Sequence, residues 1–172
     1  MHRDIKPANI FICRYGEDHD FVKVLDSGLV KTFEEGAEAA PALTREHTVR
    51  GTPAFIAPEQ ALGGTHLDGR VDIYATGCVA YWLLTGQLVF SADTTMALLV
   101  QHVHAAPSAP SSRAEQSIPA ELDQLVLDCL AKDPAKRPQS ARELGTRLGE
   151  IQNAHRWTEE HARAWWATHQ PA

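Results

Sequence analysis

Hydrophobic residues first cluster in two short runs, at residues 10–13 (IFIC) and 21–25 (FVKVL). Both runs are rich in β-branched and aromatic side chains, and the polar stretch RYGEDHD lies between them. This pattern predicts an antiparallel β-hairpin. Asn9 comes just before the first strand and Asp26 just after the second. Strand pairing would therefore bring these two side chains together at the open end of the hairpin.

The following segment, residues 27–52, is polar and small and has no sustained period, which predicts a long loop. Residues 68–86 (DGRVDIYATGCVAYWLLTG) then predict a buried helix, because apolar side chains occupy nearly every face of its second half. Asp68 is a candidate N-cap for this helix, and Gly86 is a candidate C-terminal glycine.

Further segments with helical spacing follow. Residues 94–105 predict one helix, and the run from Leu122 to Leu130 predicts another, which Pro134 should end. Ser140 with Glu143 forms a capping box for a helix that runs to about residue 153, and residues 158–167 predict a short helix in the tail. This order of elements, one hairpin followed by a long loop and then only helices, predicts a mainly α fold. The polar residues that are candidates for chemistry lie on the hairpin and the loop.

Composition excludes several classes of protein. The chain has 172 residues, of which 44% are hydrophobic, enough for one domain or part of one. Its net charge of -6 gives no electrostatic reason to expect a nucleic acid as partner. Three widely spaced cysteines argue against a disulfide framework, and the longest apolar run, residues 78–84, is much shorter than the roughly 20 residues of a membrane span. We expect a cytoplasmic segment, although an anchor outside it stays open.

Five sequence blocks occur in a fixed order: HRDIKPAN (2–9), LDSGLVK (25–31), GTPAFIAPE (51–59), DIYATG (72–77) and KDPAKRP (132–138). Together they resemble the serine/threonine protein kinase family, and most of all its bacterial branch. The resemblance covers residues 1–153 and implies the helical C-terminal lobe of the protein-kinase-like fold. Within it, residues 26–59 match the activation segment, and residues 154–172 form a tail that bears tryptophans.

The resemblance implies a reaction among ATP, Mg²⁺ and serine or threonine hydroxyls of proteins. By resemblance, Asp4 accepts the proton of the substrate hydroxyl, Lys6 stabilises the transferred phosphate, and Asn9 and Asp26 hold Mg²⁺. The predicted hairpin brings the last two together independently of the family. The structural alternatives are a surface turn for Asp4, a solvated charge for Lys6, a turn-forming Asn9 and a strand-end Asp26.

Other positions match regulatory or supporting residues of the family. Arg3 would pair with a phosphorylated residue of the activation segment, for which Thr48 is the first candidate and Thr44 the second. Both could also be ordinary loop threonines. The resemblance also implies supporting residues. Thr52 would contact the catalytic Asp and Lys, Glu59 would form an ion pair with Arg137, and Asp72 would bind the backbone of the catalytic loop.

The sequence also departs from the family pattern. Ser27 stands where the metal-binding triplet normally has Phe, and neither a GxGxxG loop nor a VAIK-like lysine is present. We therefore expect that an N-terminal lobe is required in cis and that the chain as given transfers no phosphate by itself. The alternative is a pseudokinase-like module that binds a partner without catalysis.

Two groups of ring-bearing side chains have no place in that scheme. We expect His102 and His104 to be exposed at a helix end rather than to bind a metal ion together, because no third ligand lies nearby in the sequence. We expect the tail to pack onto the domain through Trp157, Trp165 and Trp166. The alternative is that these side chains form an exposed aromatic patch that binds a partner.

Overall fold

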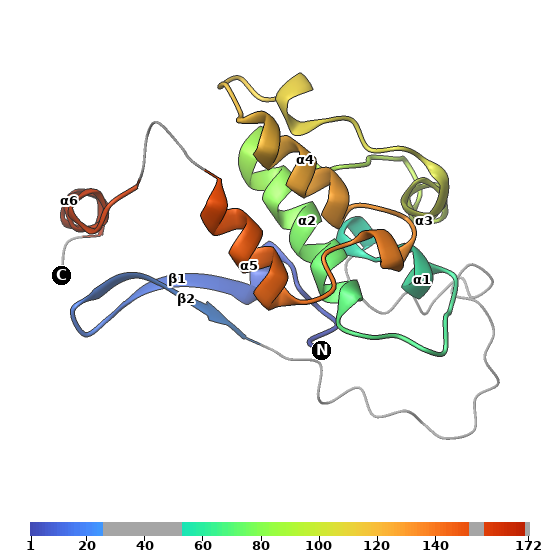
Figure 1. The fold of residues 1–172 in the computed structure, drawn as a ribbon, viewed down its shortest axis with the longest axis horizontal. Helices are drawn as coiled ribbons and strands as arrows, with labels where there is room; N and C mark the ends of the chain where they lie inside the picture. Colours follow the sequence, from blue (N-terminus) through green and yellow to red (C-terminus); the bar gives the residue numbers. More distant parts are fainter. Residues whose placement is uncertain (26–52, 152–156, 171–172) are drawn as a thin grey trace.

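The computed structural model of the chain describes residues 1–25, 53–151 and 157–170. The described part is mainly helical and carries one two-stranded antiparallel sheet, as the sequence predicts (Figure 1). The strands are β1 (Ile10–Tyr15) and β2 (Asp18–Val24), and the α-helices are α1 (Pro58–Ala61), α2 (Arg70–Thr85), α3 (Thr95–His104), α4 (Ala120–Cys129), α5 (Ala141–Glu150) and α6 (Glu159–His169).

The predicted hairpin is confirmed. Ile10 pairs with Val24 and Cys13 with Phe21, and the pairing shifts register between Cys13 and Tyr15. One further backbone bond, from the N–H of Leu25 to the carbonyl of Asn9 at 2.9 Å, extends the pairing at the open end. The hairpin therefore holds Asn9 opposite the residue that precedes Asp26, while Asp26 itself lies outside the described residues.

Helix α2 forms the centre of the helical layer (Figure 1). Its side chains Val71, Tyr74, Cys78 and Tyr81 are buried, and they pack with Val126 and Leu130 in the hydrophobic core. The helix begins after Asp68, whose Oδ1 accepts from the N–H of Arg70 at 2.9 Å, and it ends at Gly86, which has a φ of 68°. Gly86 ends the helix as the sequence predicts, but the N-cap is Gly69 and not Asp68.

A single glycine allows α4 to approach α2 closely. A Cβ atom at Gly77 would lie 2.7 Å from the Cβ of Cys129, a distance that real side chains do not tolerate. The contact between α2 and α4 thus depends on the absence of a side chain at this position.

Three further helix predictions need correction. Helix α4 ends at Cys129, several residues before Pro134, which instead begins a short 3₁₀ turn (Pro134–Lys136). Helix α5 ends at Glu150 rather than near residue 153. Its N-cap is Ser140 as predicted, and Ser140 Oγ accepts from the N–H of Glu143, but the capping box is not completed, because the Glu143 carboxylate accepts from the N–H of Gln139 and not from that of Ser140.

His102 contradicts the expectation of an exposed histidine, because its side chain is fully buried, whereas His104 is exposed as predicted. The sequence signal for burial was available: His102 follows Leu99 by three positions, so both lie on the inner face of α3. Among the described residues, no helix combines the length and the apolar character needed to cross a membrane.

Candidate active site

The segment from His2 to Asn9 is a loop attached to the first turn of α2. The carboxylate of Asp72 accepts the backbone N–H of His2 at 2.6 Å and that of Arg3 at 2.7 Å. Arg3 has a φ of 70°, a left-handed conformation that costs a residue with a side chain roughly 1–2 kcal/mol. Two charge-assisted hydrogen bonds at this point offset that cost. Asp72 thereby fixes the backbone that leads into the Arg3 turn.

Asp4 follows this turn and lies beside a cation and an amide. Lys6 Nζ is 2.9 Å from Asp4 Oδ2, and both side chains are partly accessible. Asn9, which is buried, donates from Nδ2 to the carbonyl of Asp4 at 2.8 Å and to Asp4 Oδ2 at 3.1 Å. The loop and the short 3₁₀ turn Pro7–Asn9 thus gather the side chains of Asp4, Lys6 and Asn9 in one place.

His2 connects the loop to the hairpin, a role that the sequence analysis did not assign. Its Nδ1 lies 3.4 Å from the N–H of Asp4, and its Nε2 lies 3.1 Å from the carbonyl of Leu25. A backbone N–H can only donate, so Nδ1 is the acceptor and the proton of the neutral ring is on Nε2. His2 therefore ties the backbone of Asp4 to the end of β2.

The space beneath the loop is too small for a nucleotide. A cavity of about 20 Å³ lies among Asp4, Lys6, Phe55 and Asp72, which is room for about one water molecule. The cavity walls, from α2 and the 3₁₀ turn Pro53–Phe55, support the loop from behind.

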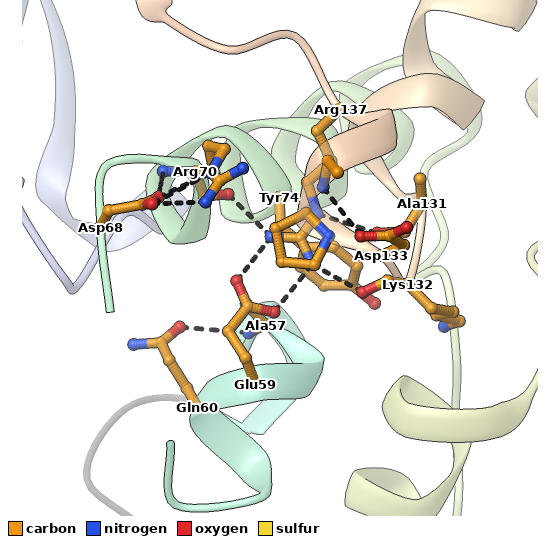
Figure 2. A network of polar contacts seen from close by, with 12 residues as sticks. Ala57, Glu59, Gln60, Asp68, Arg70, Tyr74, Ala131, Lys132, Asp133 and Arg137 are labelled. Carbon is orange, nitrogen blue, oxygen red and sulfur yellow. Dashed lines mark hydrogen bonds and ion pairs between the residues drawn. The ribbon is translucent and has the colours of Figure 1, made fainter. Parts of the chain in front are cut away.

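Glu59 and Arg137 form an ion pair between α1 and the segment before α5 (Figure 2). The two guanidinium ends contact Glu59 Oε1 at 2.6 Å and Oε2 at 2.7 Å. The Arg137 side chain is completely buried. Its charge also lies 5.0 Å from the centre of the Tyr74 ring of α2. This pair links α1 to the helical layer.

All five N–H donors of Arg137 have partners. Beyond the two bonds to Glu59, its Nε donates to the carbonyl of Ala131 at 2.8 Å, and its other donors reach the carbonyls of Arg70 at 2.9 Å and Lys132 at 3.1 Å. A buried charge is costly unless it is paired and hydrogen-bonded, and Arg137 meets both conditions.

The comparison with protein families now decides the identity. Residues 1–147, most of the chain, match the model described as "Protein kinase domain". The chain belongs to the protein kinase family. The positions of its loop, its Asp72 contacts and its Glu59–Arg137 pair all fall inside the matched region.

Kinase relatives from bacteria match nearly the whole chain. The serine/threonine-protein kinase pkn3 of Myxococcus xanthus is 39% identical over 157 residues, which are 91% of this chain and 28% of the relative. The serine/threonine-protein kinase PknB of Mycobacterium tuberculosis is 39% identical over 153 residues, 89% of this chain and 23% of the relative. The PknB of Mycolicibacterium smegmatis is 41% identical over 144 residues, 84% of this chain and 22% of the relative. The chain thus spans about a quarter of the length of these relatives.

Four residues that the resemblance assigned to this kinase-family site lie outside the described residues, together with Ser27. They are Asp26, Thr44, Thr48 and Thr52. The metal-ligand, regulatory and supporting roles suggested for them stay predictions.

A buried polar group behind the ion pair was missed by the sequence analysis. The Tyr74 hydroxyl lies 2.9 Å from His102 Nδ1. Lys132 Nζ donates to the carbonyl of His102 at 2.7 Å, and it lies 4.5 Å from the centre of the Phe90 ring. Burial, and then the nearby charge of Lys132, lower the pKa of His102 to about 4. Burial also lowers the pKa of Lys132 to about 8. Lys132 stands inside the block at residues 132–138, where only Arg137 had been given a role.

Proposed function

We propose that this chain provides the catalytic loop of an ATP-dependent serine/threonine protein kinase, which transfers the γ-phosphate of ATP to serine and threonine hydroxyls of proteins. The observation that carries the proposal is the position of the Asp4 carboxylate between the Lys6 ammonium and the Asn9 amide. In this proposal residues 1–153 form the helical lobe, and the whole protein completes the nucleotide site.

Asp4 is the proposed proton acceptor. Its Oδ2 receives the contacts from Lys6 and Asn9, so both partners orient the carboxylate. A substrate hydroxyl that approaches Asp4 would be aligned for attack, and its proton would move to the carboxylate. Lys6, two residues away, would place its positive charge beside the transferred phosphate.

Asn9 is suited to bind the metal ion that accompanies ATP. Its Nδ2 atom is used by Asp4, so Oδ1 is the atom available as a ligand. An amide oxygen together with the carboxylate of Asp26 is the kind of donor set that Mg²⁺ prefers. Bound there, Mg²⁺ would neutralise charge on the phosphates. The two hydrogen bonds to Asp4 hold the Asn9 side chain in place without the ion.

The remaining assignments concern regulation and support. Arg3 is proposed to bind a phosphate on Thr48, or on Thr44 as the second candidate, and Thr52 to contact Asp4 and Lys6. Asp72, Glu59 and Arg137 are proposed as structural supports, on the strength of the hydrogen bonds and the ion pair described above.

The test is replacement of Asp4 in the full-length protein that contains this chain. Asp4→Asn keeps the size and the hydrogen bond to Asn9 but removes the base, so transfer of phosphate from ATP to a generic protein substrate should fall roughly 10²–10⁴-fold. Asp93→Asn, a change of an exposed aspartate far along the chain, is the matched control and should leave the rate unchanged. Full activity of the Asp4→Asn variant would contradict the role of Asp4 as the base, whereas a full-length wild-type protein that transfers no phosphate would favour a non-catalytic, partner-binding module.

A further inference from the structure

The tail is bound to the hairpin through one carboxylate of β2. Asp20 Oδ1 accepts the indole N–H of Trp166, which lies in α6, and Asp20 Oδ2 accepts that of Trp157, just before α6, each at 2.7 Å. Figure 1 shows α6 beside the hairpin and apart from the helical layer. The tail therefore packs onto the hairpin, and Asp20 receives two of its tryptophans.

Asp20 lies in a bulge of the hairpin and has an uncommon backbone conformation. Cys13 pairs with Phe21 and Tyr15 with Asp18, so two residues of β2 lie opposite one residue of β1. Asp20 is one of these two residues, and its φ of 58° is left-handed, a conformation that side chains disfavour. Bulges of this kind redirect a side chain. The two indole bonds offset the cost of the conformation that directs the Asp20 carboxylate towards α6.

The other end of the same strand lies at the candidate active site. Regular pairing runs from the bulge to the pair Ile10–Val24, and the next N–H, that of Leu25, donates to the carbonyl of Asn9 at 2.9 Å. Asn9 in turn donates to Asp4. A two-stranded hairpin by itself is only marginally stable in water, and packing against a helix is one way to stabilise it. Helix α6 thus supports the strand pairing that reaches Asn9.

We propose that Asp20, Trp157 and Trp166 form a latch, by which the tail holds the hairpin in place and keeps Asn9 positioned for metal binding. When the tail detaches, the bulge relaxes and opening of the hairpin extends along β2 to Asn9. Asp20 is then a positioning residue, because it acts on the site through the strand pairing. Helix α6 lies outside residues 1–147, so the latch is not part of the segment that matches the family model. Its effect on metal binding rests on the proposed function, whereas its effect on the hairpin does not.

Amide hydrogen exchange in the full-length protein that contains this chain measures the effect on the hairpin. Trp166→Phe keeps an aromatic ring but removes the N–H that donates to Asp20. Local opening should become more frequent, and the amide of Leu25 should exchange about tenfold faster, which corresponds to about 1.4 kcal/mol. Trp157→Phe should act in the same direction, and the double variant should exceed either change alone. The amides of α2 should exchange as in the wild type, because the change is confined to the hairpin.

Two matched controls separate the latch from the loss of any indole or any carboxylate. For Trp165→Phe we expect wild-type exchange, because within the described residues the Trp165 N–H makes no hydrogen bond, and its ring stacks on His169. Asp18→Asn changes an exposed aspartate of the same strand and should have no effect. Asp20→Asn removes the charge that accepts both indoles, so its effect and that of Trp166→Phe should not add.

The connection to Asn9 is tested by the Mg²⁺ concentration that gives half of the maximal rate of phosphate transfer. Apparent affinity falls with the fraction of molecules that hold the ligand in place, so the Trp157→Phe/Trp166→Phe variant should need about threefold more Mg²⁺. Its rate at saturating Mg²⁺ should stay within about twofold of the wild-type rate. A general loss of stability would instead lower the rate at every Mg²⁺ concentration. Trp165→Phe should change neither quantity.

Three results would overturn the proposal. Unchanged exchange of the Leu25 amide in the double variant would show that the tail does not hold the hairpin. Equal acceleration of the α2 amides would show a general loss of stability. Faster exchange at Leu25 with an unchanged Mg²⁺ requirement would reject the connection to Asn9. A wild-type protein that transfers no phosphate would contradict the proposed function instead, and amide exchange would still decide whether the latch holds the hairpin.

Discussion

Replacing Arg137 by lysine should show how much stability depends on geometry rather than on charge. Arg137→Lys keeps the positive charge opposite Glu59 but replaces five N–H donors in a planar fork by three on one atom. The five acceptors around Arg137 are the two oxygens of Glu59 and the carbonyls of Arg70, Ala131 and Lys132. At least two of them would lose their donor.

The expected cost follows from that count. A buried polar group left without a hydrogen bond costs about 1–3 kcal/mol, so two such groups cost about 2–6 kcal/mol. Breaking a buried ion pair outright costs about 3–5 kcal/mol, and lysine retains part of that attraction. The Arg137 side chain is fully buried and Glu59 is 22% exposed, so little of the interaction is screened by water. We therefore expect a loss of about 3 kcal/mol in the free energy of unfolding.

Urea denaturation measures this loss. With a slope of about 2 kcal/mol per M, the midpoint should fall by about 1.5 M, and the slope itself should stay the same. Arg163→Lys is the control, because the Arg163–Glu159 pair is 65% and 71% exposed and its replacement should change the free energy by less than about 0.5 kcal/mol. If Arg137→Lys cost less than about 1 kcal/mol, or no more than the control, the argument from the five donors would be wrong.

Two further predictions concern the loop and the buried histidine. Asp72→Asn replaces one of the two accepting oxygens by an NH₂ group, so the backbone amides of His2 and Arg3 should exchange with solvent faster and phosphate transfer should fall. The control Asp93→Asn should change neither the exchange nor the transfer. Unchanged amide exchange in Asp72→Asn would show that Asp72 does not hold the loop. In the folded protein the pKa of His102 is about 4, below the ordinary histidine pKa of 6.5, so between these two pH values the unfolded chain binds more protons than the folded one. The stability contributed by neutral His102 is therefore present above pH 6.5 and is lost as the pH falls towards 4, by up to about 3 kcal/mol. Thermal or urea unfolding of His102→Gln should show a shallower decline over that range, and equal declines for His102→Gln and the exposed control His104→Gln would refute it.

The parts of the structure that follow from local pattern could be predicted from the sequence. The hairpin was predicted because its strands have β-branched and aromatic runs on either side of a glycine-containing turn, and the pairing then fixes what lies opposite Asn9. Helix α2 and its C-terminal Gly86 were predicted, because the left-handed conformation of this glycine is a local property, although the N-cap is Gly69 and not the expected Asp68. In each case the determining interaction lies within a few residues.

Features that depend on distant contacts were harder to predict. His102 was expected at the surface because two histidines at a helix end look solvated, but the hydroxyl of Tyr74, 28 residues earlier, and the ring of Phe90 provide a buried environment. The role of Lys132 likewise depends on the C-terminal carbonyls of α3, about thirty residues away. The Asp20 contacts with the tail span more than 130 residues, and no local pattern indicates them.

The supports of the site are physically connected through the first turn of α2. Arg137 donates to the carbonyl of Arg70 and stacks on Tyr74, and Asp72 lies between these two positions in the sequence. The same turn therefore carries the ion pair on one side and, through the Asp72 carboxylate, the backbone of His2 and Arg3 on the other. A shift of this turn cannot leave the loop in place, because both oxygens of Asp72 are committed to it at 2.6 and 2.7 Å. The position of Asp4 thus depends on Arg137 although the two side chains belong to opposite ends of the chain.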